Sequence, residues 1–305
     1  QAHMHSSTKP LFIEDWIKTV PAGKKVTMEV RNDDFFNLRW GDPDFARAYL
    51  NNFPEKTNGF LMGPDGYIWG REVVSKEPDS PRQQTIDKAW YAFMLWGYLA
   101  YDRTVDNSRF QALLGARFPE VPSDALYKGL ASASKVWPLV TRFFWGSLDF
   151  MWYPEASYRQ DGGYLGVQAF IDPAYPPMEE DEDGDRPLMM SVKDYVDNKG
   201  AAGRMTPVEL AAQLKQNADT AFSFVQSLNA GDNKDLRYTI GDVKAMAWLG
   251  RYYADKILGA VELYRWQKNK SDTAALNAAR THLQNSANHW RQYAAQWSSQ
   301  YIRQY

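Results

Sequence analysis

The pattern of apolar and polar residues divides the chain near residue 80. In 24–31 (KKVTMEVR) apolar and polar side chains alternate, which predicts a strand. Asp42 followed by Pro43 is typical of a helix start, and we expect this helix to reach Asn52. A second strand fits 59–62, before a turn rich in glycine and proline. The order strand, helix, strand is that of a βαβ unit and predicts parallel pairing.

From Ser80 onward the apolar positions recur at helical spacing. Ser80 and Pro81 predict the start of a helix to about Asp102, which is apolar nearly all round and is therefore expected to be buried. The sequence Thr206-Pro207-Val208-Glu209 is a capping box that predicts a helix reaching Leu228. Shorter helices are expected over 108–117, 123–137 and 139–150, with a break or kink at Pro138 between the last two. Two long helices are expected over 236–267 and 271–302, and their short connection predicts an antiparallel hairpin.

These elements predict a mainly α protein, in which a helical-bundle C-terminal domain follows a short βαβ segment. We assign 1–10 to a disordered tag remnant, because Gln1-Ala2-His3-Met4 is typical of a vector or protease-site junction. The partial βα segment covers 11–80. The helical domain covers 81–305, with a loop-rich insertion at about 153–200. Two strands cannot bury both faces of a sheet, so we expect the βα segment to pack against another structure.

Composition excludes several classes of protein. The formal charge of −2 and the pI near 6.2 argue against a nucleic-acid binder. The longest dense apolar stretch, 89–101, is about 13 residues and falls short of a bilayer span, so we expect no membrane partner. The absence of cysteine excludes disulfides and thiolate chemistry. Aromatic residues make up 15% of the chain, and most of them, Trp290 included, fit the core of a helical bundle.

No pattern in the sequence predicts a metal or a cofactor. His282 and His289 lie two helical turns apart, roughly 10 Å, which is too far for one ion. The acidic run 179–185 lacks the glutamate of a calcium loop, since the twelfth position is Met190. Nucleotide fingerprints are absent. We therefore expect no cofactor.

Carboxylates, arginines and tryptophans collect in the two loops after the predicted strands and in the aromatic segment 143–155. In sheets built from βα units, function gathers at such loops. Glycoside hydrolysis needs two carboxylates that flank the scissile bond, and aromatic faces suit the C–H surface of a sugar. We predict catalytic carboxylates among Asp33, Asp34, Asp65 and Glu72, and substrate-binding side chains at Arg31, Arg39, Trp40, Trp69, Arg71, Trp145, Trp152 and Glu155.

Several of these residues, and the nearby Asp42, also have a purely structural interpretation. Asp42 is explained by its capping position, and the pairs Asp33-Asp34 and Asp65-Gly66 are common in turns. Arg71 and Glu72 fit a surface ion pair. Dense aromatic residues belong to cores more often than to ligand platforms.

Four stretches resemble a known family: NLRWGDPDFARAYL, GFLMGPDGYIWGRE, KAWYAFMLWGYLAYD and FWGSLDFMWYPEA. They are similar to the C-terminal part of large bacterial TIM-barrel glycoside hydrolases of the α-glucuronidase-like kind, where the last βα units of a (β/α)8 barrel run into a helical domain. The resemblance covers most of 24–300. It implies that Arg31, Asp33 and Asp34 lie at the mouth of the penultimate strand, and Asp65, Trp69 and Glu72 at that of the last.

The resemblance implies a bacterial protein, secreted or periplasmic, that acts on or binds a plant or algal polysaccharide. A complete barrel takes about 250 residues, and only about 60 precede the helical part here, so we expect a truncated or reduced barrel. This interpretation leaves room for a homo-oligomer or for a missing partner that completes the barrel. Three functions remain open: a glycoside hydrolase, a non-catalytic carbohydrate-binding or accessory domain, and a helical scaffold that binds no sugar.

Overall fold

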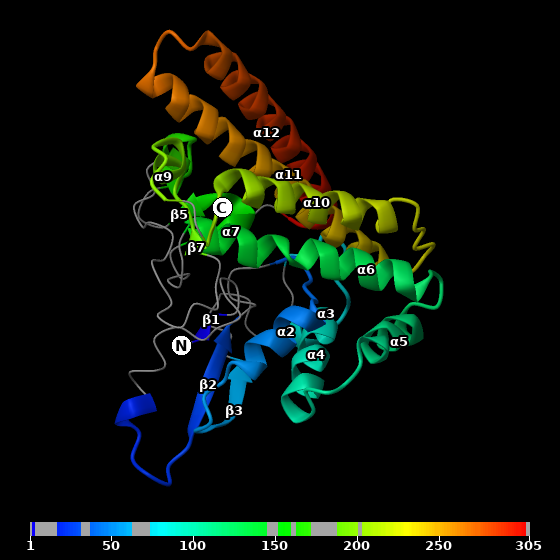
Figure 1. Cartoon of the computed structure of the whole chain (residues 1–305). Helices are drawn as coiled ribbons and strands as arrows, with labels where there is room; N and C mark the ends of the chain where they lie inside the picture. The colour runs from blue at the N-terminus through cyan, green and yellow to red at the C-terminus, as the bar shows by residue number, and fades with distance from the viewer. Residues whose placement is uncertain are drawn as a thin grey trace.

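The computed structural model describes residues 2–3, 17–31, 37–62, 74–144, 152–159, 163–171, 188–200 and 203–302. Most of these residues are helical, and the strands form three small sheets. In Figure 1 the three longest helices, α10, α11 and α12, lie together at the top, with α6 and α7 beneath them. The strands β2 and β3 and the helix α2 lie at the opposite end. The predicted mainly α fold with a short βα segment is confirmed.

The βα segment has the predicted parallel pairing. Strand β2 (Val26–Arg31) pairs with β3 (Thr57–Met62), and α2 (Pro43–Asn51) connects them. The Asp42 side chain accepts from the backbone N–H groups of Asp44 and Phe45, which explains why α2 starts where it does.

A third strand, β1 (Ala2–His3), pairs in parallel with the other edge of β2. These two residues were expected to be part of a disordered remnant. The free edge of β2 offers unpaired N–H and C=O groups, and a short extended segment satisfies them.

The buried helix predicted from Ser80 begins later than expected. The structure has a short α3 (Thr85–Lys88) followed by α4 (Trp90–Tyr101). The start is fixed by Gln84, whose backbone N–H donates to the Asp87 carboxylate, so the capping box forms there instead of at Ser80. Within α4, Leu95, Trp96 and Leu99 are fully buried, as the apolar pattern predicts.

The break caused by Pro138 lies three residues earlier than the proline. Helix α5 (Asn107–Arg117) matches its prediction closely, whereas α6 (Ser123–Ser134) ends before α7 (Val136–Phe144), with Lys135 between them. Pro138 has no N–H to donate to the carbonyl of Ser134, so α6 cannot continue and the proline sits in the first turn of α7. The freed Ser134 carbonyl instead accepts from the Trp40 indole N–H at 3.1 Å.

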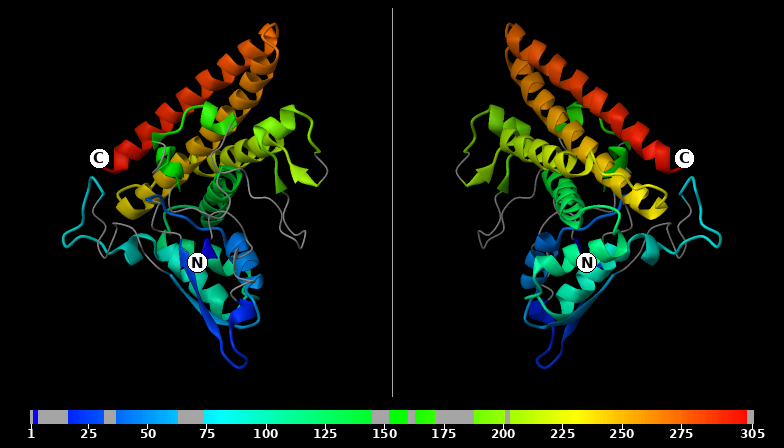
Figure 2. Two further views of the ribbon diagram at one scale, coloured as in Figure 1. Left: turned by 90° about the vertical axis from the view of Figure 1, so that its left-hand side faces the viewer. Right: turned by 90° about the vertical axis from the view of Figure 1, so that its right-hand side faces the viewer.

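The C-terminal helices form the predicted antiparallel hairpin, and a third helix packs beside it. Helices α10 (Pro207–Val225), α11 (Lys234–Lys268) and α12 (Thr273–Gln300) account for most of the bundle, and both views in Figure 2 show α11 and α12 side by side. The capping box at Thr206 and Glu209 is confirmed. The two helices approach closely at Gly241, where an added Cβ would lie 1.4 Å from the Gln300 side-chain oxygen.

Short elements occupy the described part of the loop-rich region. They are β4 (Trp152–Tyr153), η1 (Pro154–Ala156), β5 (Tyr158–Arg159), β6 (Gly163–Tyr164), α8 (Gln168–Ile171), β7 (Leu188–Met189), α9 (Val192–Val196) and β8 (Arg204–Met205). Strands β4, β5 and β6 pair antiparallel, and β7 pairs with β8 in parallel. The acidic run 179–185 lies outside the described residues.

Candidate functional site

Most of the predicted site residues fall outside the part of the chain that the structure describes. This holds for Asp33, Asp34, Asp65, Trp69, Arg71, Glu72 and Trp145. For Arg31 and Trp152 the structure describes the strand but not the surroundings of the side chain. The catalytic assignments therefore stay predictions, and the three remaining residues, Arg39, Trp40 and Glu155, are considered in turn.

Arg39 is held inside the molecule by carboxylates of α11. Its guanidinium lies 2.8 Å from Asp242 and 3.0 Å from Asp235, and 9% of the side chain is exposed. Tyr301 and Gln300, at the end of α12, also donate to Asp242, at 2.7 and 2.8 Å. The guanidinium thus joins the βα segment to the bundle, and its predicted role as a substrate-binding group stays a prediction.

Trp40 is likewise used within the fold. Its ring stacks on Trp96, with centroids 6.3 Å apart, and meets Phe45 edge-on at 5.9 Å. The side chain is 8% exposed, and its N–H is bonded to Ser134. The indole thus contributes to the core, and the predicted role of Trp40 in substrate binding stays a prediction.

Glu155 is a partly buried carboxyl group at the junction of the two parts of the fold. The backbone N–H of Leu38 donates to it at 2.9 Å, and the Tyr293 hydroxyl donates to its backbone oxygen at 2.7 Å. Burial raises the pKa of Glu155 from 4.5 to about 7, against the opposing effects of the Leu38 and Asn37 backbone and of Lys88. The group therefore changes charge near neutral pH while it anchors the loop after β2.

The raised pKa of Glu155 predicts that stability falls between pH 5 and pH 7. A folded pKa of about 7 above the ordinary 4.5 gives stabilisation that is complete below pH 4.5 and is lost as pH rises through 7. This amounts to about 2 kcal/mol of unfolding free energy between pH 5 and pH 7. Glu155→Gln keeps an acceptor for Leu38 and should flatten the profile, as measured by denaturant unfolding at both pH values.

Burial also raises the pKa of Asp42, to about 6. The pH dependence of wild-type stability therefore contains contributions from both Asp42 and Glu155. The difference between wild type and Glu155→Gln isolates the effect of Glu155. Identical slopes for the two proteins between pH 5 and pH 7 would contradict the assignment.

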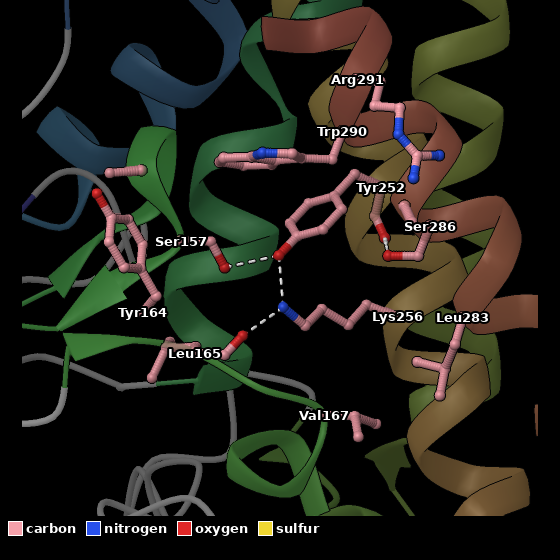
Figure 3. Close-up of a pocket in the computed structure, with 12 residues that line it drawn as sticks. Ser157, Tyr164, Leu165, Val167, Tyr252, Lys256, Leu283, Ser286, Trp290 and Arg291 are labelled. Carbon is pink, nitrogen blue, oxygen red and sulfur yellow. Dashed lines mark hydrogen bonds between the residues drawn. The ribbon is translucent and has the colours of Figure 1, made fainter.

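The candidate site is a pocket of about 710 Å³ between residues 156–157 and 164–167 on one side and the hairpin of α11 and α12 on the other (Figure 3). The segment after η1 forms one side, and the two long helices form the other. The lining residues are Ala156, Ser157, Tyr164, Leu165, Val167, Tyr252, Lys256, Leu283, Ser286, Ala287, Trp290 and Arg291. A volume of this size is typical of small-molecule sites.

The floor of the pocket is a chain of hydrogen bonds. Tyr252 and Lys256 are one turn apart on α11, so their side chains lie on one face of the helix. The Lys256 ammonium donates to the Tyr252 hydroxyl and to the Leu165 carbonyl, both at 2.5 Å, and the Tyr252 hydroxyl lies 2.7 Å from Ser157 Oγ. Burial lowers the pKa of Lys256 to about 8 and raises that of Tyr252 to about 12.

Ser157 adopts a backbone conformation that is uncommon for its residue type. Its φ of 47° lies in the left-handed region, which few residues other than glycine occupy. The conformation is held by the hydrogen bond from the Leu165 N–H to the Ser157 carbonyl at 2.9 Å and by the contact with Tyr252. Such strain is concentrated at functional sites, and here it turns the hydroxyl toward the pocket floor.

Aromatic rings form two walls of the pocket. Trp290, on α12, is partly buried and packs on Tyr252, with ring centroids 4.9 Å apart. Tyr164, on β6, is 81% exposed and lies on the opposite side in Figure 3. The expectation that Trp290 belongs to the bundle core is therefore only partly right, because the ring also lines the pocket.

The two histidines of the bundle share one carboxylate. Asp255 lies 2.8 Å from His282 Nδ1 and 3.2 Å from His289 Nε2. Burial lowers the pKa of His289. In the described ranges no cluster of three or more histidines and carboxylates is arranged to hold a metal ion. Among the same residues, no helix combines the length and apolar character needed to cross a bilayer.

Comparisons with known proteins show a likeness of fold to a solved structure. No family model matches the chain, and no curated protein matches it. The chain is similar to the solved structure of a GH138 enzyme targeting pectin rhamnogalacturonan II, with a TM-score of 0.76 and 13% sequence identity. The match covers 98% of this chain and 36% of that chain, so the chain spans about a third of the neighbour's length. At this identity the likeness concerns the fold, and the fold is one that occurs within a glycoside hydrolase.

Proposed function

We propose that this chain is a carbohydrate-active protein of the glycoside hydrolase-like kind, and that the pocket between residues 156–157, residues 164–167 and the α11–α12 hairpin binds a sugar unit of a polysaccharide. The observation that carries the proposal is the pocket itself, which combines aromatic walls with a hydrogen-bonded floor. The similar fold of an enzyme described as targeting pectin rhamnogalacturonan II supports a plant polysaccharide as the ligand.

The chemistry of the pocket suits a sugar ring. Apolar C–H faces of a sugar pack against aromatic rings, and Trp290 and Tyr164 offer such rings on two sides. Sugar hydroxyls both donate and accept hydrogen bonds, and the Ser157 and Tyr252 hydroxyls do the same. A pocket usually fixes the orientation of its ligand with a small number of polar groups placed among apolar ones.

The pocket favours binding over turnover. Its lining contains no aspartate or glutamate among the described residues, whereas hydrolysis requires a pair of carboxylates. Turnover would depend on the predicted carboxylates Asp33, Asp34, Asp65 and Glu72. The narrower α-glucuronidase-like class, the secreted or periplasmic location and the homo-oligomer or partner chain are parts of the proposal that rest on the sequence.

Affinity gels that contain pectin, rhamnogalacturonan II or a neutral glucan, run beside an assay for released reducing sugar, test the function. Retarded migration in the pectic gels without release is the expected result. Release that disappears in Asp65→Ala would favour a hydrolase instead. Unchanged migration in every gel, with no release, would contradict the proposal and favour a helical scaffold.

A further inference from the structure

We propose that the floor of this pocket is an anion site, in which the Lys256 ammonium receives the carboxylate of an acidic sugar. The inference rests on the proposed sugar-binding function and gives it a substrate class. It is carried by the position of Lys256, which is 8% exposed, lines the pocket, and is held between the Tyr252 hydroxyl and the Leu165 carbonyl (Figure 3).

Lys256 is a buried cation whose contacts, among the described residues, are neutral groups. Its two hydrogen-bond acceptors carry no net charge, and its ammonium lies 5.0 Å from the Phe170 ring centroid and 4.8 Å from that of Tyr252. An ammonium has three N–H donors, and in the described part of the chain two acceptors are found for it. Taking a charge out of water without a counter-ion is unfavourable, and a ligand carboxylate would supply both the counter-ion and the third acceptor.

The charged side chains in the rest of the pocket lining are also positive. Arg291, exposed at the other end of the pocket from the floor, donates to the neutral side chain of Asn288 at 2.8 Å. The lining residues therefore include two cationic side chains and, within the described ranges, no acidic one. A neutral sugar would cover Lys256 without compensating its charge, whereas an acidic sugar would compensate it.

A matched pair of ligands isolates the carboxylate. Oligogalacturonides and their fully methyl-esterified forms share one backbone and differ in charge, so titration calorimetry with both measures what the carboxylate adds. We expect the acid to bind about 10- to 100-fold more tightly than the ester at pH 6, the range for hydrogen bonds to a charged group. Lys256→Met should remove this preference, and Lys256→Arg should retain most of it.

Lys244→Met is the matched control, because Lys244 lies on the same helix, is partly buried and is absent from the lining. Its preference should equal that of the wild type. Equal affinity of the wild type for acid and ester would overturn the inference and leave sugar binding intact. No binding of either would overturn the proposed function as well. Displacement of the acid by inorganic phosphate at similar concentration would contradict a sugar carboxylate as the ligand.

The pH dependence of the preference for the acid over the ester tests the role of the Lys256 charge without a variant. The pKa of Lys256 is lowered to about 8 by burial, so the preference for the acid should shrink as pH rises from 6 to 9.5. Tyr252, whose pKa is about 12, stays neutral in this range, and Arg291 stays charged. Among the described residues, the stretch 164–167 presents the Leu165 carbonyl to Lys256, and α8 presents the Phe170 ring. A preference that is constant from pH 6 to pH 9.5 would contradict the role of Lys256.

Discussion

Replacing Asp242 with alanine is expected to lower the free energy of unfolding by about 3–5 kcal/mol, the range for breaking a buried ion pair. Asp242 is fully buried and accepts from Arg39, Gln300 and Tyr301. Removing the carboxylate leaves the Arg39 guanidinium inside the protein with Asp235 as its remaining ion-pair partner among the described residues. Without the Asp242 carboxylate, Arg39 loses its link through this residue to α11 and to the end of α12.

Chemical denaturation of wild type and Asp242→Ala measures this effect. Asp219→Ala is the matched control, because Asp219 also pairs with an arginine, Arg251 at 2.7 Å, but at the surface. Surface pairs contribute about 1 kcal/mol or less. A loss for Asp242→Ala as small as that of the control would show that the buried network does not hold the two parts together.

Replacing Trp290 with alanine is expected to weaken polysaccharide binding by about 30-fold or more, the effect of truncating an aromatic anchor of an interface. Trp290 lines the pocket beside Tyr252 and Tyr293, with ring centroids at 4.9 and 5.1 Å. Its removal takes away one wall of the pocket and also some packing, so the variant must be compared at a temperature where it is folded. Calorimetric titration with a pectic oligosaccharide gives the affinity.

Tyr164→Ala separates binding from packing. Tyr164 is 81% exposed, so its loss should weaken binding with little change in stability. Tyr101 is 96% exposed and absent from the pocket lining, so Tyr101→Ala should change neither property. If Tyr164→Ala and Tyr101→Ala bind with equal affinity, then Tyr164 is not a wall of the binding site.

The helices could be predicted because their signals are local. The capping box at Thr206 and the cap at Asp42 each fix a start through hydrogen bonds within a few residues. The helix break lies before Pro138 and not at it, because proline has no N–H to donate to the carbonyl four residues earlier. The partner of that carbonyl, Trp40, lies 94 positions away in the sequence, and no local pattern announces such a contact.

The pocket could not be predicted from the sequence, because its parts are far apart along the chain. Ser157 and Tyr252 are separated by 95 positions, and they meet through the antiparallel hairpin and the turn after η1. The one local signal was the spacing of Tyr252 and Lys256 on one face of a buried helix. The ion pair of Arg39 is equally hidden from local patterns, since its carboxylate partner Asp242 lies 203 positions away.

A calorimetric titration of the wild-type protein with a pectic oligosaccharide, repeated with the double variant Tyr164→Ala/Trp290→Ala, tests directly whether the pocket is the sugar site. We expect saturable binding to the wild type and none to the variant under the same conditions. Binding to the double variant as tight as to the wild type, or no binding to the wild type, would contradict the assignment of this pocket as the sugar site.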